Sequence, residues 1–262
     1  MQVEGTGVVV TGAGSGLGRA VANRLATAGA AVGVVDLSID AATETATGCG
    51  GDSRPVAIDV ADAAGSEAAF AALVDGLAPL RVLVCCAGIQ QGARVVRRDG
   101  PVSLDWFRRT VEVNLTGTFN WVRLFASHVA ALDPVDRDGQ RGVIVMTSSI
   151  TATDGVDGGV AYAAAKAGVA GMTLPLAREL APIGVRVVSV APGTFATPMI
   201  ATMPVDYSAA LAAQVPHPRR FGDPDEFAAL VSSIVANDYL NGEVIRLDGG
   251  LRMPPSSAIR PA

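Results

Sequence analysis

The sequence has few of the residues that build a metal centre, a disulfide framework or a nucleic-acid-binding surface. It contains two histidines and three cysteines among 262 residues, too few for a zinc cluster or a set of disulfide bonds. The net charge is −5 and no long run of lysine or arginine occurs, which argues against an electrostatic nucleic-acid footprint. We therefore expect no bound metal, no nucleic-acid partner and reduced, inert thiols.

Long apolar runs are also missing, although half of the residues are hydrophobic and the mean hydropathy is +0.39. The best candidate, residues 160–177, contains Tyr162 and Lys166, whereas a membrane span needs about 20 predominantly apolar residues. A strand-like run begins at Gly7 and leaves no room for a secretory leader. We expect a cytoplasmic protein without a membrane partner.

The sequence does contain a regular alternation of short β-branched runs and longer alanine-rich segments. The runs predict strands at residues 8–11, 31–35, 56–59, 82–86, 143–147, 185–190 and 244–247, and the segments predict helices at 17–28, 66–76, 104–131, 160–181 and 224–236. Strands separated in this way form parallel units with right-handed crossovers. The prediction is one α/β domain over residues 1–262, with a Rossmann-type, doubly wound, seven-stranded parallel sheet and helices on both faces.

A glycine-rich turn, TGAGSGLG at residues 11–18, joins the first predicted strand to the first predicted helix. Glycines at this place let the backbone approach a pyrophosphate, and the helix N-terminus attracts its charge. Glycine also serves simple tight turns, so the turn alone is weak evidence. With the residues that follow, Gly12, Gly16 and Gly18 indicate a dinucleotide site.

Asp36 follows the second predicted strand, 18 residues after Gly18. There a carboxylate can accept hydrogen bonds from the adenosine ribose of NAD. The same carboxylate would repel the 2′-phosphate of NADP, with an energy of about 4 kcal/mol when the two charges are roughly 4 Å apart. The alternative is that Asp36 merely caps a helix beginning near Ser38. Asp59 and Val60, at the end of the third predicted strand, are in a position to flank the adenine.

Tyr162 and Lys166 lie four residues apart on a predicted helix and therefore share one face. A phenol ionises near pH 10, but a neighbouring ammonium and a positive nicotinamide both favour the phenolate. Tyr162 is thus the expected base, with Lys166 as its tuning partner and as a donor to the nicotinamide ribose.

Ser149 follows the fifth predicted strand, 13 residues before Tyr162, at the sheet edge where such folds bind ligands. Its hydroxyl is expected to orient the substrate oxygen, although Ser148 is adjacent and only spacing favours Ser149. Asn114 is a polar residue in an otherwise apolar helix. It is expected to hold a water that links Lys166 to solvent, the alternative being a satisfied buried amide.

These motifs occur in the order expected of one family. The set is TGxxxGxG at 11–18, Asn114, Ser149, Tyr162, Lys166 and Pro192-Gly193. In this combination the chain resembles the short-chain dehydrogenase/reductase family over essentially its whole length. The segments at 138–144, 171–175, 214–216 and 241–249 further resemble the type II 3-hydroxyacyl-CoA dehydrogenase branch, also called type-10 17β-hydroxysteroid dehydrogenase.

The resemblance implies an NAD-dependent oxidoreductase of fatty acid metabolism, a homotetramer that interconverts (S)-3-hydroxyacyl-CoA and 3-oxoacyl-CoA. Tyr162 would be the base and Ser149 would contact the substrate. Cofactor contacts are implied for Gly12, Ser15, Gly16, Leu17, Gly18, Asp36, Asp59, Val60, Cys86, Ala87, Gly88, Tyr162, Lys166, Pro192, Phe195 and Thr197. The alternatives are a hydroxysteroid or other secondary-alcohol dehydrogenase that does not use coenzyme A, and a dinucleotide-binding protein without turnover.

Three further features bear on these expectations. Cys85 stands where the wider family has an asparagine that braces neighbouring strands, which puts sheet stability in question. One segment is apolar enough to cover an acyl chain or a steroid, or else it packs on the core. Its apolar residues are Phe195, Met199, Ile200, Met203, Tyr207 and Leu211. Arg94, Arg97 and Arg98 follow the fourth predicted strand and are candidates for pairing with coenzyme A phosphates.

Overall fold

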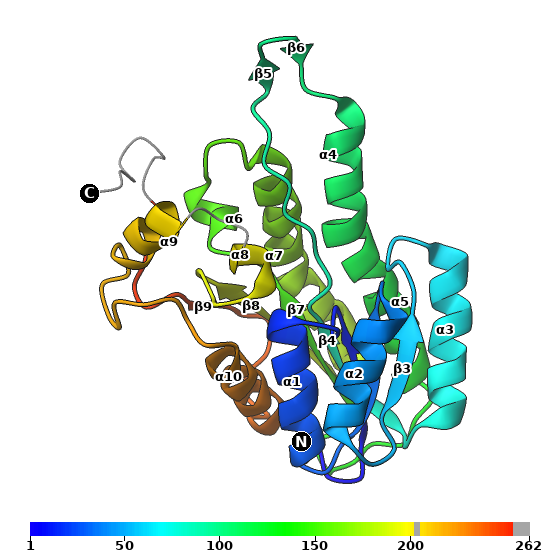
Figure 1. Cartoon of the computed structure of the whole chain (residues 1–262). Coiled ribbons are helices and arrows are strands. Elements are labelled where there is room, and N and C mark those ends of the chain that lie inside the picture. The colour runs from blue at the N-terminus through cyan, green and yellow to red at the C-terminus, as the bar shows by residue number, and fades with distance from the viewer. Residues whose placement is uncertain (202–204, 254–262) are drawn as a thin grey trace.

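The computed structural model describes residues 1–201 and 205–253, and its centre is a seven-stranded parallel sheet (Figure 1). The strand order is β3-β2-β1-β4-β7-β8-β9. The strands are β1 (Gly7–Thr11), β2 (Ala31–Asp36), β3 (Arg54–Ala57), β4 (Leu80–Cys85), β7 (Gly142–Thr147), β8 (Val185–Pro192) and β9 (Val244–Leu247). The predicted doubly wound α/β fold is confirmed. Its strand order reverses between β1 and β4, and ligands of such folds bind at the carboxyl ends of the strands beside that point.

Helices cover both faces of the sheet. The longer ones are α1 (Gly16–Thr27), α2 (Ile39–Cys49), α3 (Ala63–Gly76), α5 (Gly117–Val129), α7 (Val160–Leu180) and α10 (Pro224–Ala236); α4 (Leu104–Val111), α6 (Thr151–Asp154), α8 (Pro198–Ala201) and α9 (Val205–Ala212) are short. Helix α10 begins at a capping box formed by Asp223 and Glu226, which satisfies two otherwise free backbone N–H groups.

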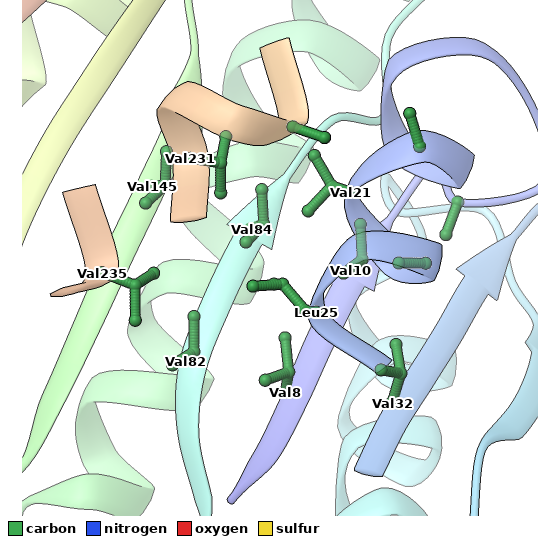
Figure 2. Close-up of a cluster of buried hydrophobic side chains, with 14 of the residues drawn as sticks. Val8, Val10, Val21, Leu25, Val32, Val82, Val84, Val145, Val231 and Val235 are labelled. Carbon is green, nitrogen blue, oxygen red and sulfur yellow. The ribbon is translucent and has the colours of Figure 1, made fainter. Parts of the chain in front are cut away.

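Alternate residues of each strand face opposite layers, so the sheet separates two apolar cores. Valines such as Val8, Val10 and Val84 pack against α1, α2 and α10, and Figure 2 shows this cluster around Leu25. Residues of the other strand faces pack against α3, α5 and α7, where Trp121 and Phe125 are completely buried. The two cores hold the carboxyl ends of the strands in fixed positions.

Several boundaries differ from the predictions. The predicted helix at 104–131 is divided by a π-helical turn, Glu112–Thr116, in which Asn114 lies. Helix α2 was anticipated only as a helix beginning near Ser38 in the alternative for Asp36, because its threonines and glycine give it a weak helical signal. The third strand ends at Ala57 instead of residue 59. A hairpin of β5 (Val96–Arg97) and β6 (Gly100–Pro101) projects beyond α4 (Figure 1).

Among the described residues, one helical stretch, Val160–Ile183, is long and apolar enough to cross a membrane by length and composition alone. In this structure it carries the buried ammonium of Lys166. Its Val169, Leu176 and Leu180 are part of the core between the sheet and α5. A buried core helix passes the same test, so the feature does not favour a membrane protein.

Candidate active site

A cavity of about 500 Å³ opens at the carboxyl ends of β1 and β4, where the strand order reverses. All the residues predicted to contact a cofactor line it, and so does Ser149. Asn114 does not line the cavity and is completely buried. One cavity therefore unites segments that are more than 180 residues apart in the sequence.

The glycine-rich turn leaves the N-terminus of α1 open toward this cavity. Ser15 precedes the helix in an extended conformation, makes no capping hydrogen bond, and no acidic residue occupies the first turn. Gly12 has a φ of +66°, and a Cβ on Gly18 would lie 2.2 Å from the Gly12 carbonyl oxygen. The free N–H groups and the positive end of the helix dipole suit a phosphate.

The Asp36 carboxylate is fixed at the edge of the cavity. It accepts hydrogen bonds from the backbone N–H of Gly14 at 2.8 Å and of Ser38 at 3.1 Å. The cap of α2 is the Ser38 hydroxyl, which accepts from the N–H of Ala41. Asp36 is thus held by the glycine-rich turn and does not serve as the helix cap.

Asp59 lies two residues beyond β3, in the loop that follows the strand. Its carboxylate accepts from the Ala61 N–H and forms an ion pair of 2.6 Å with Arg109. Burial acts to raise the pKa of Asp59, but these two partners outweigh it and hold that pKa below its usual value. Arg109 also lines the cavity, and sequence reasoning missed it because its partner is 50 residues away.

Ser149 and Tyr162 both line the cavity and lie within hydrogen-bonding reach of each other. The Ser149 hydroxyl accepts hydrogen bonds from the N–H and the hydroxyl of Thr151, so its own proton is free to be donated. Burial raises the pKa of Tyr162 to about 12, and a hydrogen bond with Ser149 partly opposes that shift. Ser148 instead donates to the Lys166 carbonyl, which assigns it a structural role.

The Lys166 ammonium lies 5.6 Å from the centroid of the Tyr162 ring and donates to the Thr147 carbonyl at 2.7 Å. Burial lowers its pKa to about 8, and the nearby Cys86 and Cys85 only partly offset this effect. The predicted proximity to the phenol is present. Burial nevertheless has the largest effect on the pKa of both Tyr162 and Lys166.

Asn114 is positioned by the π-helical turn. Its side-chain amide donates to the carbonyls of Ile89 and Thr110, both at 2.9 Å. Its Oδ1 is buried and receives no hydrogen bond from the described residues. A Cβ built on Gly88 would lie 2.6 Å from this oxygen and 3.5 Å from the Lys166 Nζ, so Gly88 keeps the space between them open. The side-chain NH2 group of Asn114 is therefore hydrogen-bonded, whereas its Oδ1 is not. This oxygen lies next to the space that Gly88 leaves open beside Lys166.

The two neighbouring cysteines occupy different environments. Cys85 is buried in β4, paired in register with Thr11 and Met146. Cys86 lines the cavity, and its sulfur lies 3.6 Å from the Thr147 hydroxyl. Burial raises the pKa of both thiols, that of Cys86 to about 11. All three cysteines are free in this structure.

The cavity lining also includes a set of apolar side chains, called the apolar wall here, of which Ile150 directly follows Ser149 in the chain. The apolar wall is formed by Ile150, Val156, Phe195, Ile200, Leu211 and Met253. Met253 was not predicted to belong to the site, because it follows the last strand and only the folding of the chain brings it to the cavity. Met203 lies outside the described residues, as do the side chains of Met199 and Tyr207.

The three arginines proposed for coenzyme A do not line the cavity. Arg97 is part of the exposed β5–β6 hairpin, where it pairs with Asp99 at 3.4 Å. Arg94 and Arg98 are exposed beside it. Their proposed pairing with phosphates stays a prediction without support from this arrangement.

The glycine-rich turn, the N-terminus of α1 and Asp36 together fit a dinucleotide and are called the dinucleotide cradle here. Next to Ser149, Tyr162 and the buried Lys166, this cradle defines a nicotinamide-dependent oxidoreductase. Comparison with known proteins agrees: the family model of short chain dehydrogenases matches residues 6–207. The chain belongs to the short-chain dehydrogenase family.

Curated relatives span nearly the whole chain. Human 3-hydroxyacyl-CoA dehydrogenase type-2 is 43% identical over 255 residues, which is 97% of each chain. The Drosophila melanogaster protein of the same name is 45% identical over 249 residues, covering 94% of this chain and 97% of that one. The crystal structure of 3-hydroxyacyl-CoA dehydrogenase type-2 from Mycobacterium avium superposes with a TM-score of 0.92, at 39% identity, over 97% of this chain and 98% of that one.

Proposed function

We propose that this protein interconverts 3-hydroxyacyl-CoA and 3-oxoacyl-CoA with NAD as the cofactor. One observation carries the oxidoreductase chemistry: Ser149 and Tyr162 line the same cavity as the dinucleotide cradle and the apolar wall. The names of the type-2 relatives supply the thioester substrate, and the resemblance to the type II branch implies the (S)-hydroxy isomer.

The residues of the cradle fit NAD. The open N-terminus of α1 would hold the pyrophosphate, Asp36 the adenosine ribose, and Lys166 the nicotinamide ribose. The fixed, negatively charged Asp36 disfavours a 2′-phosphate. When bound, NAD supplies the hydride acceptor for alcohol oxidation, and its reduced form supplies the hydride for ketone reduction.

The protein's own residues handle the proton and the substrate oxygen. The Ser149 hydroxyl, held by Thr151, donates to the oxygen of the alcohol or ketone. Tyr162 takes the proton during oxidation and returns it during reduction. Lys166 and the free Oδ1 of Asn114 would hold the water that passes this proton to solvent.

The pKa of Tyr162 fixes the direction of the pH dependence. Burial raises that pKa to about 12 in the protein alone, so the phenol is protonated at neutral pH and is ready to act as an acid for ketone reduction. Oxidation needs the phenolate, which a positive nicotinamide and a charged Lys166 would stabilise. The oxidation rate should therefore rise with pH, whereas the reduction rate should fall once the phenol ionises.

A Tyr162→Phe variant tests this assignment. We expect NADH to bind with unchanged affinity, while reduction of acetoacetyl-CoA falls by about a hundredfold or more, the range lost with a general acid. Tyr239→Phe is the matched control, because Tyr239 is 99% exposed. Unchanged turnover in Tyr162→Phe would remove Tyr162 from its role.

We also propose a homotetramer, as the family resemblance predicts. Helices α4, α5 and α7 carry the exposed apolar side chains Leu104, Phe119, Val160 and Leu174, and covering them against further copies would remove apolar surface from water. Light scattering coupled to gel filtration distinguishes a mass four times 26.5 kDa from the monomer mass.

A further inference from the structure

Arg246, on the last strand, is the centre of a partly buried ion-pair network that also contacts residues 251–253. Its Nε donates to Asp248 at 2.8 Å. Its Nη1 and Nη2 donate to the two carboxylate oxygens of Asp154, both at 2.9 Å. The side chains of Asp154 and Asp248 are only 9% and 8% exposed and that of Arg246 is 25% exposed, so this bidentate clamp is partly shielded from water.

The clamp attaches the chain after β9 to helix α6. Arg246 also donates to the Leu251 carbonyl at 3.0 Å, and the Met253 N–H donates to Asp154 at 3.1 Å. Leu251 is buried against Ile150 and Val215, and Met253 packs on this cluster. Both ends of residues 251–253 are therefore fixed by polar contacts, and the side chain of Leu251 is an apolar anchor for the segment.

This attachment places one side chain at the site. Met253 lines the cavity together with Ile150, which directly follows Ser149 in the chain. Asp154 lies on α6, only five residues after Ser149. The same ion pair thus links helix α6 to the segment that carries Met253. The Arg246 hydrogen bonds hold the pKa of Asp154 at about 2, so the clamp stays charged throughout the range in which the enzyme would work.

We propose that Met253, held in place by Leu251 and Arg246, forms a fixed wall for the carbon chain of the substrate and determines chain-length specificity, with Arg246 acting as a positioning residue. The reading of this wall as an acyl site rests on the proposed function. A flexible thioether suits apolar chains of varied shape, and each methylene accepted or excluded by an apolar pocket changes specificity by about tenfold or more.

Substitutions at Met253 test the wall directly. The substrates are 3-oxoacyl-CoA thioesters of four to ten carbons and, in parallel, CoA-free 3-oxo esters of the same lengths. With Met253→Ala, we expect the ratio of kcat/KM for eight carbons to that for four carbons to rise by about tenfold; with Met253→Phe it should fall by a similar factor. NADH affinity should stay within twofold in both variants.

The positioning role is tested by Arg246→Met, with Arg252→Met as the matched control. Arg252 contacts the same Asp248 at 3.0 Å but is 65% exposed and does not reach Asp154. We expect Arg246→Met to raise KM for the eight-carbon substrate by about tenfold with little change in kcat for the four-carbon substrate, and to expose the Met253 amide to hydrogen exchange. Arg252→Met should change neither.

The outcomes separate the two proposals. If the wild type reduces only CoA-free esters, the proposed thioester function fails, while the chain-length ratios on those esters still decide the role of Met253. Ratios within twofold of wild type for both Met253 variants would overturn the inference. So would an Arg246→Met variant that keeps wild-type KM values while its Met253 amide exchanges freely.

Discussion

Replacing Lys166 by methionine should stabilise the cofactor-free protein while abolishing its activity. Burial lowers the pKa of Lys166 to about 8, from an ordinary value of 10.5. At about 1.4 kcal/mol per pKa unit, keeping the ammonium charged costs the folded state about 3 kcal/mol. Methionine has a similar length and no charge, but it leaves the Thr147 carbonyl without a donor, at a cost of about 1 kcal/mol or more.

The net gain expected at pH 7 is thus about 1 to 2 kcal/mol, which raises Tm by about 4 °C for a chain of this size. The gain depends on pH in a defined direction. Below pH 8, Lys166 is charged in both the folded and unfolded states, and the full cost applies. Between pH 8 and 10.5 the unfolded state binds more protons, so wild-type stability rises and the advantage of the variant disappears.

Thermal unfolding of Lys166→Met and wild type from pH 6 to 10.5 provides the measurement. Arg178→Met is the matched control, because Arg178 lies on the same helix and is exposed, so its Tm difference should not vary with pH. A Lys166→Met variant that is less stable at pH 7, or whose Tm difference from wild type is the same at pH 7 and 10.5, would refute the reasoning.

Two further predictions concern the cofactor end of the cavity. Asp36→Asn keeps an acceptor for the Gly14 N–H and removes the charge, so kcat/KM for NADPH relative to NADH should rise by at least about tenfold; an unchanged ratio would show that the charge does not select NAD. Cys85 and Cys86 should resist iodoacetamide at pH 7.5 in the folded protein, because burial raises the pKa of both thiols and the thiolate is the reactive form. Mass spectrometry after timed labelling measures this, and rapid modification of Cys86 would contradict it.

The sequence predicts best where local spacing determines geometry. Tyr162 and Lys166 are one helical turn apart, and helical periodicity alone brings them to one face. Asp36 and Ser149 follow strands of a parallel sheet, whose carboxyl ends meet at one edge. These residues line one cavity in the structure.

Features that depend on distant partners carry no local signal. Arg109 reaches Asp59 across 50 residues, and Met253 reaches Asp154 across 99, so neither side chain was assigned to the site. The π-helical turn at Asn114 is equally hidden, since the helical pattern continues through it. A polar residue in an apolar helix was the only indication, and such turns often occur at functional sites.

The central claim is tested most directly by the initial rate of NADH oxidation with acetoacetyl-CoA, compared with ethyl acetoacetate and with NADPH as the alternative reductant. The account predicts efficient reduction of the thioester with NADH, with much lower kcat/KM for the CoA-free ester and for NADPH. Reduction of the ester alone, or no reduction of any 3-oxoacyl thioester by protein that binds NADH, would contradict it.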